Sequence, residues 1–197
     1  MNRCGASVQL AEATSDNSYY QKAWNDCSKA IKIDRSLAVA FYNRCSIQLN
    51  LGGFAEAVKD CDRAIQKAPR FAPSYVKRCA AKVSLGQYKS ALSDCDKALA
   101  LDAGLAKAHS NNCAAKLRLG QLKDAKEDCN RSLKINPNLA IAYVNRGAIS
   151  RALGDVNSAV DDYTQAIRLQ PDLAIAYGNR GNSFSDLGRY REAIRDF

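Results

Sequence analysis

Residues 139–172 read LAIAYVNRGAISRALGDVNSAVDDYTQAIRLQPD, and the same plan recurs along most of the chain. A first segment ends in Leu153-Gly154. A second segment places its apolar residues at the i, i+3, i+4, i+7 spacing of an amphipathic helix, as far as Pro171. Gly just past a helix accepts the left-handed conformation that closes it, and Pro stops the helix before it. The stretch therefore predicts two helices joined by a glycine turn.

This plan repeats every 34 residues without insertion or deletion. The blocks begin at Leu37, Phe71, Leu105, Leu139 and Leu173. A fixed period of this length is typical of a repeat protein, in which each unit buries its apolar face only against its neighbours. We therefore expect one continuous array. It would consist of a degenerate first repeat or cap at 1–36, repeats at 37–70, 71–104, 105–138 and 139–172, and a truncated repeat at 173–197.

The repeated positions resemble those of the tetratricopeptide repeat family. The family's aromatic, small, Leu-Gly, Ala, aromatic, Ala and Pro positions appear here as Tyr143, Gly147, Leu153-Gly154, Ala159, Tyr163, Ala166 and Pro171. The resemblance covers residues 37–197 strongly and 1–36 weakly, where the first helix, at about residues 5–15, is polar. It implies an all-α fold, a right-handed superhelical solenoid of antiparallel helix pairs, and a non-enzymatic scaffold or adaptor that binds other proteins.

The net charge of +9 is unevenly distributed. Residues 139–197 hold seven Arg and seven acidic residues, so the excess lies in residues 1–138, with 22 basic and 13 acidic residues. The asymmetry favours an acidic partner, although a merely solubilising surface would look the same. No Lys/Arg run marks a nucleic-acid site, so we do not expect nucleic acid as a partner. No apolar run approaches the ~20 residues of a membrane span.

The eight cysteines follow the repeat. Cys45, Cys79 and Cys113 share one column, Cys27, Cys61, Cys95 and Cys129 share another, and Cys4 stands outside both. Later repeats carry Gly147 and Gly181 in the first column, and Tyr163 and Phe197 in the second. A column that accepts Cys or an aromatic is a core position, where free Cys acts as a small hydrophobe. We therefore expect free thiols and, with no secretory signal in view, a cytoplasmic location.

The search for catalytic residues is negative. His109 is the one histidine, and it stands in the aromatic column of the repeat, where we expect it to pack. No C-x-x-C pair, phosphate-binding glycine loop or G-x-S-x-G stands in the sequence. We expect no enzyme, no cofactor and no metal.

Asparagines form a column on the first helix of four repeats, which Lys77 interrupts. The family resemblance puts this column on the concave wall of the superhelix, where amides that donate and accept could clamp the backbone of an extended peptide. Alternatively, these amides bond neighbouring helices and stabilise the array. Nearby cations could receive an acidic residue or a free carboxylate. The predicted groove residues are Asn43, Lys77, Lys107, Asn111, Arg118, Asn145 and Asn179.

Two other functions fit parts of the sequence. The Asp-Cys pairs at 60–61, 94–95 and 128–129 are similar to the co-chaperone branch of the family, which grips a C-terminal carboxylate tail. Only Asn43 and Lys77 match that branch's clamp, because Val8 and Glu12, or Tyr42 and Ser46, stand where a Lys and an Asn should be. A basic nucleic-acid-binding helical-repeat protein is the other alternative. Its candidate surface is the column Lys29, Arg63, Lys97 and Arg131, although cations there also complement the helix dipole.

Two further columns predict ion pairs. Arg44, Arg78, Arg146 and Arg180 each precede an Asp by 16 residues, across the glycine turn. A helical hairpin brings such residues to a similar height, so we expect structural Arg–carboxylate pairs. Asn112 breaks the pattern and leaves Asp128 to find another donor.

The C-terminal repeat is cut within its second helix. We expect a fragment of a longer array, or an open end that packs against another chain by end-to-end self-association. The apolar residues at this end are Leu187, Tyr190, Ala193, Ile194 and Phe197.

Overall fold

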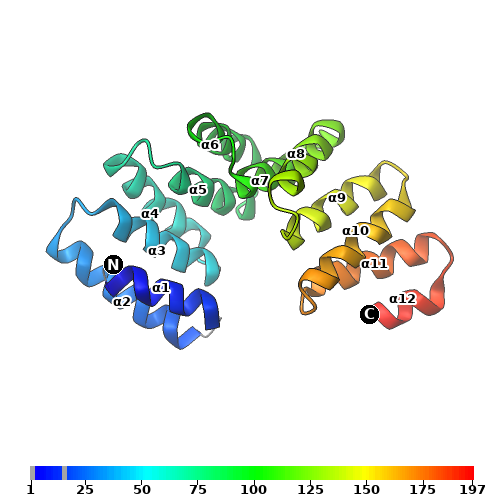
Figure 1. The fold of residues 1–197 in the computed structure, drawn as a ribbon, viewed down its shortest axis with the longest axis horizontal. Helices are drawn as coiled ribbons and strands as arrows, with labels where there is room; N and C mark the ends of the chain where they lie inside the picture. The colour runs from blue at the N-terminus through cyan, green and yellow to red at the C-terminus, as the bar shows by residue number, and fades with distance from the viewer. Residues whose placement is uncertain (1–2, 15–16) are drawn as a thin grey trace. The chain divides into compact units, whose positions relative to one another are not determined.

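The computed structural model describes residues 3–14 and 17–197, and the regular structure in these ranges is all α-helix. The chain divides into two compact units, Met1–Ala103 and Gly104–Phe197. The first unit contains α1 (Arg3–Thr14), α2 (Asn17–Ile33), α3 (Ala38–Asn50), α4 (Phe54–Lys67), α5 (Ala72–Ser84) and α6 (Tyr88–Leu101). Within it, α1 packs on α2, α3 on α4 and α5 on α6, and α4 also contacts α5 (Figure 1).

The second unit contains α7 (Ala106–Arg118), α8 (Leu122–Ile135), α9 (Ala140–Ala152), α10 (Val156–Leu169), α11 (Ala174–Asp186) and α12 (Tyr190–Asp196). The pairing repeats here, with α7 on α8, α9 on α10 and α11 on α12. The first helices also meet one another, because α9 contacts both α7 and α11. The all-helical fold of helix pairs that the sequence predicts is confirmed.

Each glycine turn closes its first helix as the sequence indicates. Gly154 adopts φ 86°, which L side chains rarely adopt, and the amide of Asp155 then donates to the carbonyl of Ser150 at 2.9 Å. The same backward bond follows each of the other turn glycines. These are Gly52, Gly86, Gly120 and Gly188, with φ between 71° and 77°. The turn is short, so the chain reverses at once and the two helices run antiparallel.

Small side chains lie where the helices of a pair meet. The alanine column of the second helices is buried throughout, at Ala23, Ala57, Ala91, Ala125, Ala159 and Ala193. Ser132 stands in a second small column, and its hydroxyl donates to the carbonyl of Ala106 at 2.8 Å. Because these side chains are small, neighbouring helices can approach closely.

The two ends of the chain differ from the regular pattern. The predicted first helix corresponds to α1, which packs on α2 and α3; residue 15, its expected end, lies outside the described residues. At the other end, Tyr190, Ile194 and Phe197 are 66%, 75% and 74% exposed. Ala193 is buried, so the exposed apolar face is narrower than the sequence indicates. None of the helices in the described ranges combines the length and apolarity needed to cross a bilayer.

Candidate functional site

An arginine on the first helix grips an aspartate on the second in four of the helix pairs. Arg146 donates from Nε to Oδ2 of Asp162 at 2.9 Å and from Nη2 to Oδ1 at 2.6 Å. This hydrogen bonding raises the pKa of Arg146. The same two-pronged contact joins Arg44 to Asp60, Arg78 to Asp94 and Arg180 to Asp196. The predicted ion pairs are therefore confirmed.

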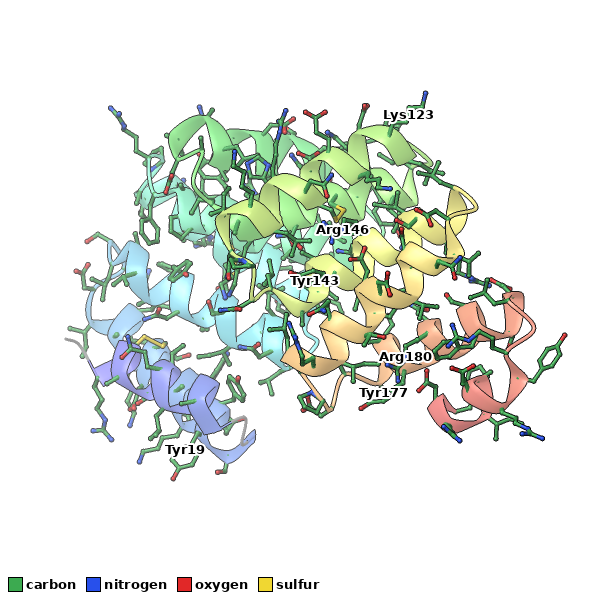
Figure 2. All side chains as sticks on the ribbon, turned by 45° about the vertical axis from the view of Figure 1, so that its right-hand side comes forward. Tyr19, Lys123, Tyr143, Arg146, Tyr177 and Arg180 are labelled. Carbon is green, nitrogen blue, oxygen red and sulfur yellow. A yellow bond between two sulfur atoms is a disulfide. The ribbon has the colours of Figure 1, made fainter. Side chains whose placement is uncertain are left out.

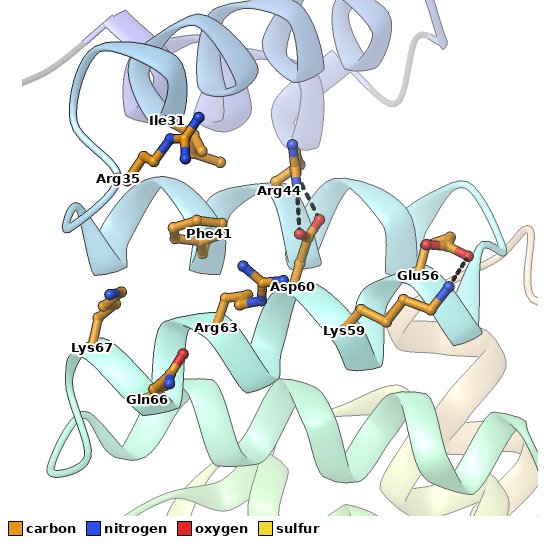
Figure 3. Close-up of a pocket in the computed structure, with 10 residues that line it drawn as sticks. All are labelled: Ile31, Arg35, Phe41, Arg44, Glu56, Lys59, Asp60, Arg63, Gln66 and Lys67. Atoms are coloured by element: carbon orange, nitrogen blue, oxygen red, sulfur yellow. Dashed lines mark hydrogen bonds and ion pairs between the residues drawn. The ribbon is translucent and has the colours of Figure 1, made fainter.

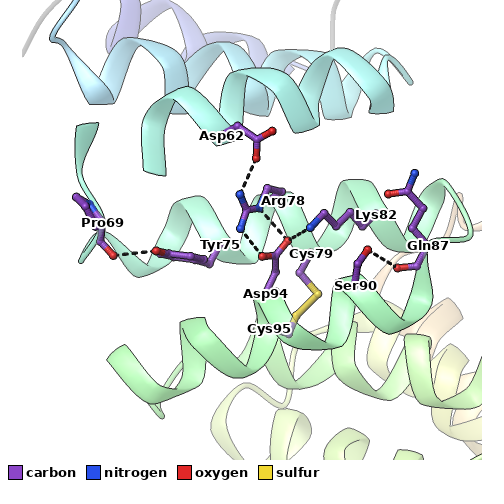
Figure 4. A network of polar contacts seen from close by, with 10 residues as sticks. All are labelled: Asp62, Pro69, Tyr75, Arg78, Cys79, Lys82, Gln87, Ser90, Asp94 and Cys95. Atoms are coloured by element: carbon purple, nitrogen blue, oxygen red, sulfur yellow. Dashed lines mark hydrogen bonds and ion pairs between the residues drawn. A yellow bond between two sulfur atoms is a disulfide. The ribbon is translucent and has the colours of Figure 1, made fainter. Parts of the chain in front are cut away.

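The third guanidinium nitrogen makes a contact that the sequence analysis missed. Nη1 of Arg78 donates to Asp62 at 2.6 Å, on the second helix of the preceding pair (Figure 4). The other three arginines reach the same column, 16 residues earlier, at Ser28, Asn130 and Thr164. Each arginine thus joins two successive second helices. The sequence does contain a signal for this contact, because Ser28, Asp62, Asn130 and Thr164 are all polar and recur at the period of the repeat.

Each of these arginines also lies over the aromatic ring three residues before it. The guanidinium carbon is 5.4 Å from the ring centre of Tyr143 for Arg146, and 5.7 Å from that of Tyr177 for Arg180 (Figure 2). Such cation–π contacts stabilise by roughly 0.5–1 kcal/mol at exposed sites. In Arg44, Arg78, Arg146 and Arg180 all three guanidinium nitrogens therefore donate hydrogen bonds to other residues of the chain. These contacts argue for a structural role.

Asp128 finds two other donors where Asn112 replaces the arginine. Lys116 donates from Nζ to Oδ2 of Asp128 at 2.6 Å, and Nδ1 of His109 lies 3.4 Å from Oδ1. His109 is buried in the aromatic column, so its place in the core is as expected. The histidine therefore has a structural explanation in its contact with Asp128.

The expectation of free thiols is wrong. The structure pairs all eight cysteines, as Cys4–Cys27, Cys45–Cys61, Cys79–Cys95 and Cys113–Cys129. The glycine turn sets the two cysteine columns at the same height, with Cα atoms 5.3 to 5.6 Å apart in the three regular pairs. This separation lies within the range that a disulfide bridges without backbone movement.

Where the disulfide is missing, a glycine and an aromatic replace it together. The ring of Tyr163 fills the space over Gly147, where an added Cβ would lie 2.8 Å from Cε1. Phe197 covers Gly181 in the same way, with a 3.0 Å approach. The two columns therefore change as a pair, either Cys with Cys or Gly with an aromatic. The prediction of free thiols was wrong because the aromatic does have a compensating partner, the glycine in the other column.

The first helix pair shifts both contacts by two helical turns. Cys4 and Arg3 stand seven residues before the positions that the 34-residue period assigns, which Ala11 and Leu10 occupy. Seven residues are close to two turns, so the same face is kept. Arg3 donates to Asp26 at 3.2 Å, next to the Cys4–Cys27 disulfide. Cys4 is therefore not an outlier but a member of the same pattern.

The predicted groove residues fall into different environments. Asn43, 7% exposed, donates from Nδ2 to Sγ of Cys4 at 3.3 Å and is committed within the first unit. Lys77, in the same unit, is half-buried and interacts with another group, as does Asn111 in the second unit. Lys107 and Arg118 are exposed on α7.

Asn145 and Asn179 differ from Asn43. Both are half-buried, and neither side-chain amide hydrogen-bonds to a residue that the structure describes. The backbone carbonyl of Asn179 accepts from Ser183, but its amide group does not take part. One turn earlier on the same helix faces, Ile141 and Ile175 are 41% and 51% exposed. We call these four residues the amide wall of the second unit.

A pocket of about 300 Å³ adjoins the amide wall. It is lined by Ala148, Arg151, Ala152, Tyr163, Asn179 and Asp186. Arg151 donates from Nε to Oδ2 of Asp186 at 2.5 Å, a hydrogen bond that lowers the pKa of the Asp186 carboxyl. Asn145 and Ala148 are three residues apart on α9 and so share a face of that helix. The wall and pocket together offer amides, apolar surface and one ion pair.

No metal-binding cluster of three His, Cys, Asp or Glu side chains occurs in residues 3–14 and 17–197. The polar groups of the amide wall and its adjoining pocket are amides and the Arg151–Asp186 ion pair. They are suited to hydrogen bonding a ligand.

Comparison with known proteins gives two family matches and several similar structures. A family model described as "TPR repeat" matches residues 148–188, and one described as "Tetratricopeptide repeat" matches residues 115–139. No curated protein matches the chain.

Three solved structures illustrate the likeness. PilW, described as a widely conserved type IV pilus biogenesis factor, has a TM-score of 0.80 at 20% identity over 100% of this chain and 91% of that one. TTC0263, described as a thermophilic TPR protein in Thermus thermophilus, has 0.74 at 18% over 97% and 98%. YrrB, described as a TPR protein with an unusual peptide-binding site, has 0.59 at 22% over 86% and 88%.

At these identities the structures show the fold alone, and the two family models match residues 115–139 and 148–188. The chain therefore has the fold of tetratricopeptide repeat proteins, and these two segments are tetratricopeptide repeats.

Proposed function

We propose that this protein is a non-enzymatic scaffold that binds an extended peptide segment of a partner protein along the amide wall of its second unit. The observation that carries the proposal is the pair of half-buried amides at Asn145 and Asn179, which hydrogen-bond to no described residue. A half-buried amide that bonds no protein group is left to water, and a ligand that replaces this water gains a net hydrogen bond of ~0.5–1.5 kcal/mol.

The chemistry of the wall suits a peptide backbone. Each Asn amide offers two donors and an acceptor, which matches the alternating N–H and C=O groups of an extended chain. The exposed Ile141 and Ile175 would contact apolar side chains of that chain. The adjoining pocket of about 300 Å³ would hold one side chain beside the Arg151–Asp186 pair.

We propose that the bound peptide is acidic. Lys107 and Arg118 are exposed on α7 and stand four residues before and seven after Asn111, so the three share one helix face. Their charges would attract a carboxylate at that end of the second unit. Such attraction between exposed groups fades as salt is added.

The test uses a display library of random peptides, selected on the immobilised protein. Selected peptides are then titrated by calorimetry against the wild type and the double variant Asn145→Ala with Asn179→Ala. Two lost hydrogen bonds, at ~0.5–1.5 kcal/mol each, should weaken binding by roughly tenfold. Asn138→Ala with Asn157→Ala is the matched control, because both residues are exposed and neither stands on α9 or α11. It should leave the affinity unchanged.

Thermal unfolding separates a binding role from a structural one. The double variant should unfold at the same temperature as the wild type or higher, because no described partner is lost and Ala favours a helix. Unchanged affinity together with a lower unfolding temperature would make the column structural and refute the proposal.

The carboxylate-tail function receives less support. It needs Asn43, whose amide is already bonded to Cys4, so the clamp that the sequence suggested is partly occupied. A free C-terminal carboxylate on the selected peptides should therefore matter little, and amidation of that carboxylate tests this directly.

The paired cysteines bear on where such binding would take place. The cytoplasmic location that the sequence predicts rests in part on free thiols. Disulfides persist mainly in oxidising compartments, so we propose an oxidising compartment as the working environment.

Self-association through the C-terminal repeat also remains a proposal. It is supported by the exposed Tyr190, Ile194 and Phe197. Light scattering should report an oligomer that Ile194→Lys dissociates, and a monomer at all concentrations would refute it.

A further inference from the structure

A second pocket lies wholly within the first unit, between α2, α3 and α4. Its volume is about 490 Å³, in the range of small-ligand sites. It is lined by Ile31, Arg35, Phe41, Arg44, Glu56, Lys59, Asp60, Arg63, Gln66 and Lys67. Figure 3 shows the ring of Phe41 with Arg35, Arg63 and Lys67 around it. Neither the amide wall nor any predicted groove residue contributes to this pocket.

The pocket has an excess of positive charge. Five of its lining residues are basic and two are acidic, a net charge of +3. Both acidic residues are already paired, Asp60 with Arg44 and Glu56 with Lys59. The side chains of Arg35, Arg63 and Lys67 form no ion pair or hydrogen bond with any residue in the described part of the chain. Three cations thus face one hollow without a counter-charge.

The next repeat has a hydrogen bond that the repeat of this pocket lacks. In the next repeat the hydroxyl of Tyr75 donates to the carbonyl of Pro69 at 3.0 Å (Figure 4). Phe41 and Arg35 stand at those two positions here, so the ring lacks the hydroxyl that would make this bond.

Two of the cations are departures from their columns. Lys67 stands where the other repeats have Ile33, Leu101, Ile135 and Leu169. Arg35 stands where they have Pro69, Ala103, Pro137 and Pro171. The general demands of the repeat therefore do not explain these two residues, and both line the same pocket.

We propose that this pocket binds a phosphate-bearing anion. Like charges in one hollow repel each other, and an anion placed among them removes that repulsion. A carboxylate brings one charge, whereas a phosphate monoester brings about −1.5 to −2 and three acceptor oxygens. The guanidinium groups of Arg35 and Arg63 present the forked donors that bind phosphate with two hydrogen bonds. Lys67 supplies a point charge at the pocket edge.

Calorimetric titration with inorganic pyrophosphate tests the proposal. A phosphoserine peptide and its unphosphorylated form make a second arm, which separates a free phosphate compound from a phosphorylated chain. Binding of pyrophosphate or of the phosphorylated peptide, with no binding of the unphosphorylated one, supports the proposal. Absence of binding by both phosphate probes at millimolar concentration overturns it.

Matched variants locate the site. Arg63→Gln should weaken binding by roughly tenfold or more, the effect of losing a charged hydrogen bond. Lys97→Gln is the control, because Lys97 is exposed in the same column one repeat later and loses the same charge. Its affinity should stay within about twofold of the wild type, since hydrogen bonds rather than net charge carry the proposed site.

Restoring the repeat gives a second test. Lys67→Leu and Arg35→Pro each install a residue that other repeats carry at that position, so both variants should fold, as thermal unfolding will verify. Both should weaken pyrophosphate binding. If Arg63→Gln and Lys97→Gln weaken it equally, the attraction is general and the pocket is not a site. The proposal would also be overturned if a random RNA oligomer bound more tightly than pyrophosphate and Lys67→Leu left the affinity for that RNA unchanged.

Discussion

Converting the Gly147–Tyr163 pair into a cysteine pair should reveal that the two columns act together. Gly147→Cys alone places a side chain where a Cβ would already lie 2.8 Å from the Tyr163 ring, an overpacking that costs about 2 kcal/mol. Tyr163→Cys alone empties the site of a ring that is 1% exposed, at a cost of about 3 kcal/mol. Independent effects would therefore sum to about 5 kcal/mol.

The double variant should lose far less. With both changes the clash disappears, and a disulfide across 16 residues stabilises by about 3 kcal/mol, which offsets the lost ring. Hydrogen exchange of the α9 and α10 amides gives the local free energy of unfolding for each variant. We expect the oxidised double variant to lie within about 1 kcal/mol of the wild type and to lose about 3 kcal/mol on reduction. Additive losses in the double variant would refute the pairing of the columns.

Three other predictions concern single features. Ser74→Ala should raise the free energy of unfolding, measured in urea, by about 1 kcal/mol. The buried Ser74 hydroxyl has no hydrogen-bond partner in the described part of the chain, and the other repeats carry Ala at this position. A loss of stability would contradict this reasoning. Burial raises the pKa of Tyr163 from 10.0 to about 12. The contribution of Tyr163 to the free energy of unfolding should therefore be intact below pH 10 and be lost as the pH rises through 12, by up to about 3 kcal/mol. Tyrosinate absorbance against pH measures the ionisation of the ring, and Tyr163→Phe should remove this pH dependence. Thiol titration of the denatured protein, with a trapping reagent and no reductant, should find none of the eight cysteines free, and more than about two reactive thiols would contradict the pairing.

Periodicity predicts the parts of this fold that recur. The turn glycines, the alanine column and the Arg–Asp pairs recur at fixed spacing, and each has a local physical reason that a single repeat already contains. The cysteines needed a different comparison. In its own column Tyr163 replaces a cysteine, and in the other column Gly147 replaces the cysteine that would pair with it.

The remaining features depend on departures from the period. Asn43 is occupied because Cys4, in the degenerate first helix and 39 residues away, accepts its hydrogen bond. Asn145 has no such partner among the described residues, so one column contains both a structural residue and a proposed binding residue. The basic pocket depends on Arg35 and Lys67, which differ from the residues at the same positions of the other repeats. Residues that do not recur cannot be predicted from the period.

The most direct test of the proposed function observes the two amides themselves. Side-chain NH₂ resonances of Asn145 and Asn179 can be assigned by comparing spectra of the wild type with those of Asn145→Ala and Asn179→Ala. They are then followed while a library-selected peptide is added. We predict that both pairs of resonances shift together with the same apparent affinity as calorimetry reports, and that the Asn43 amide stays in place. Saturation of the protein by the peptide with both resonances unmoved would contradict the account.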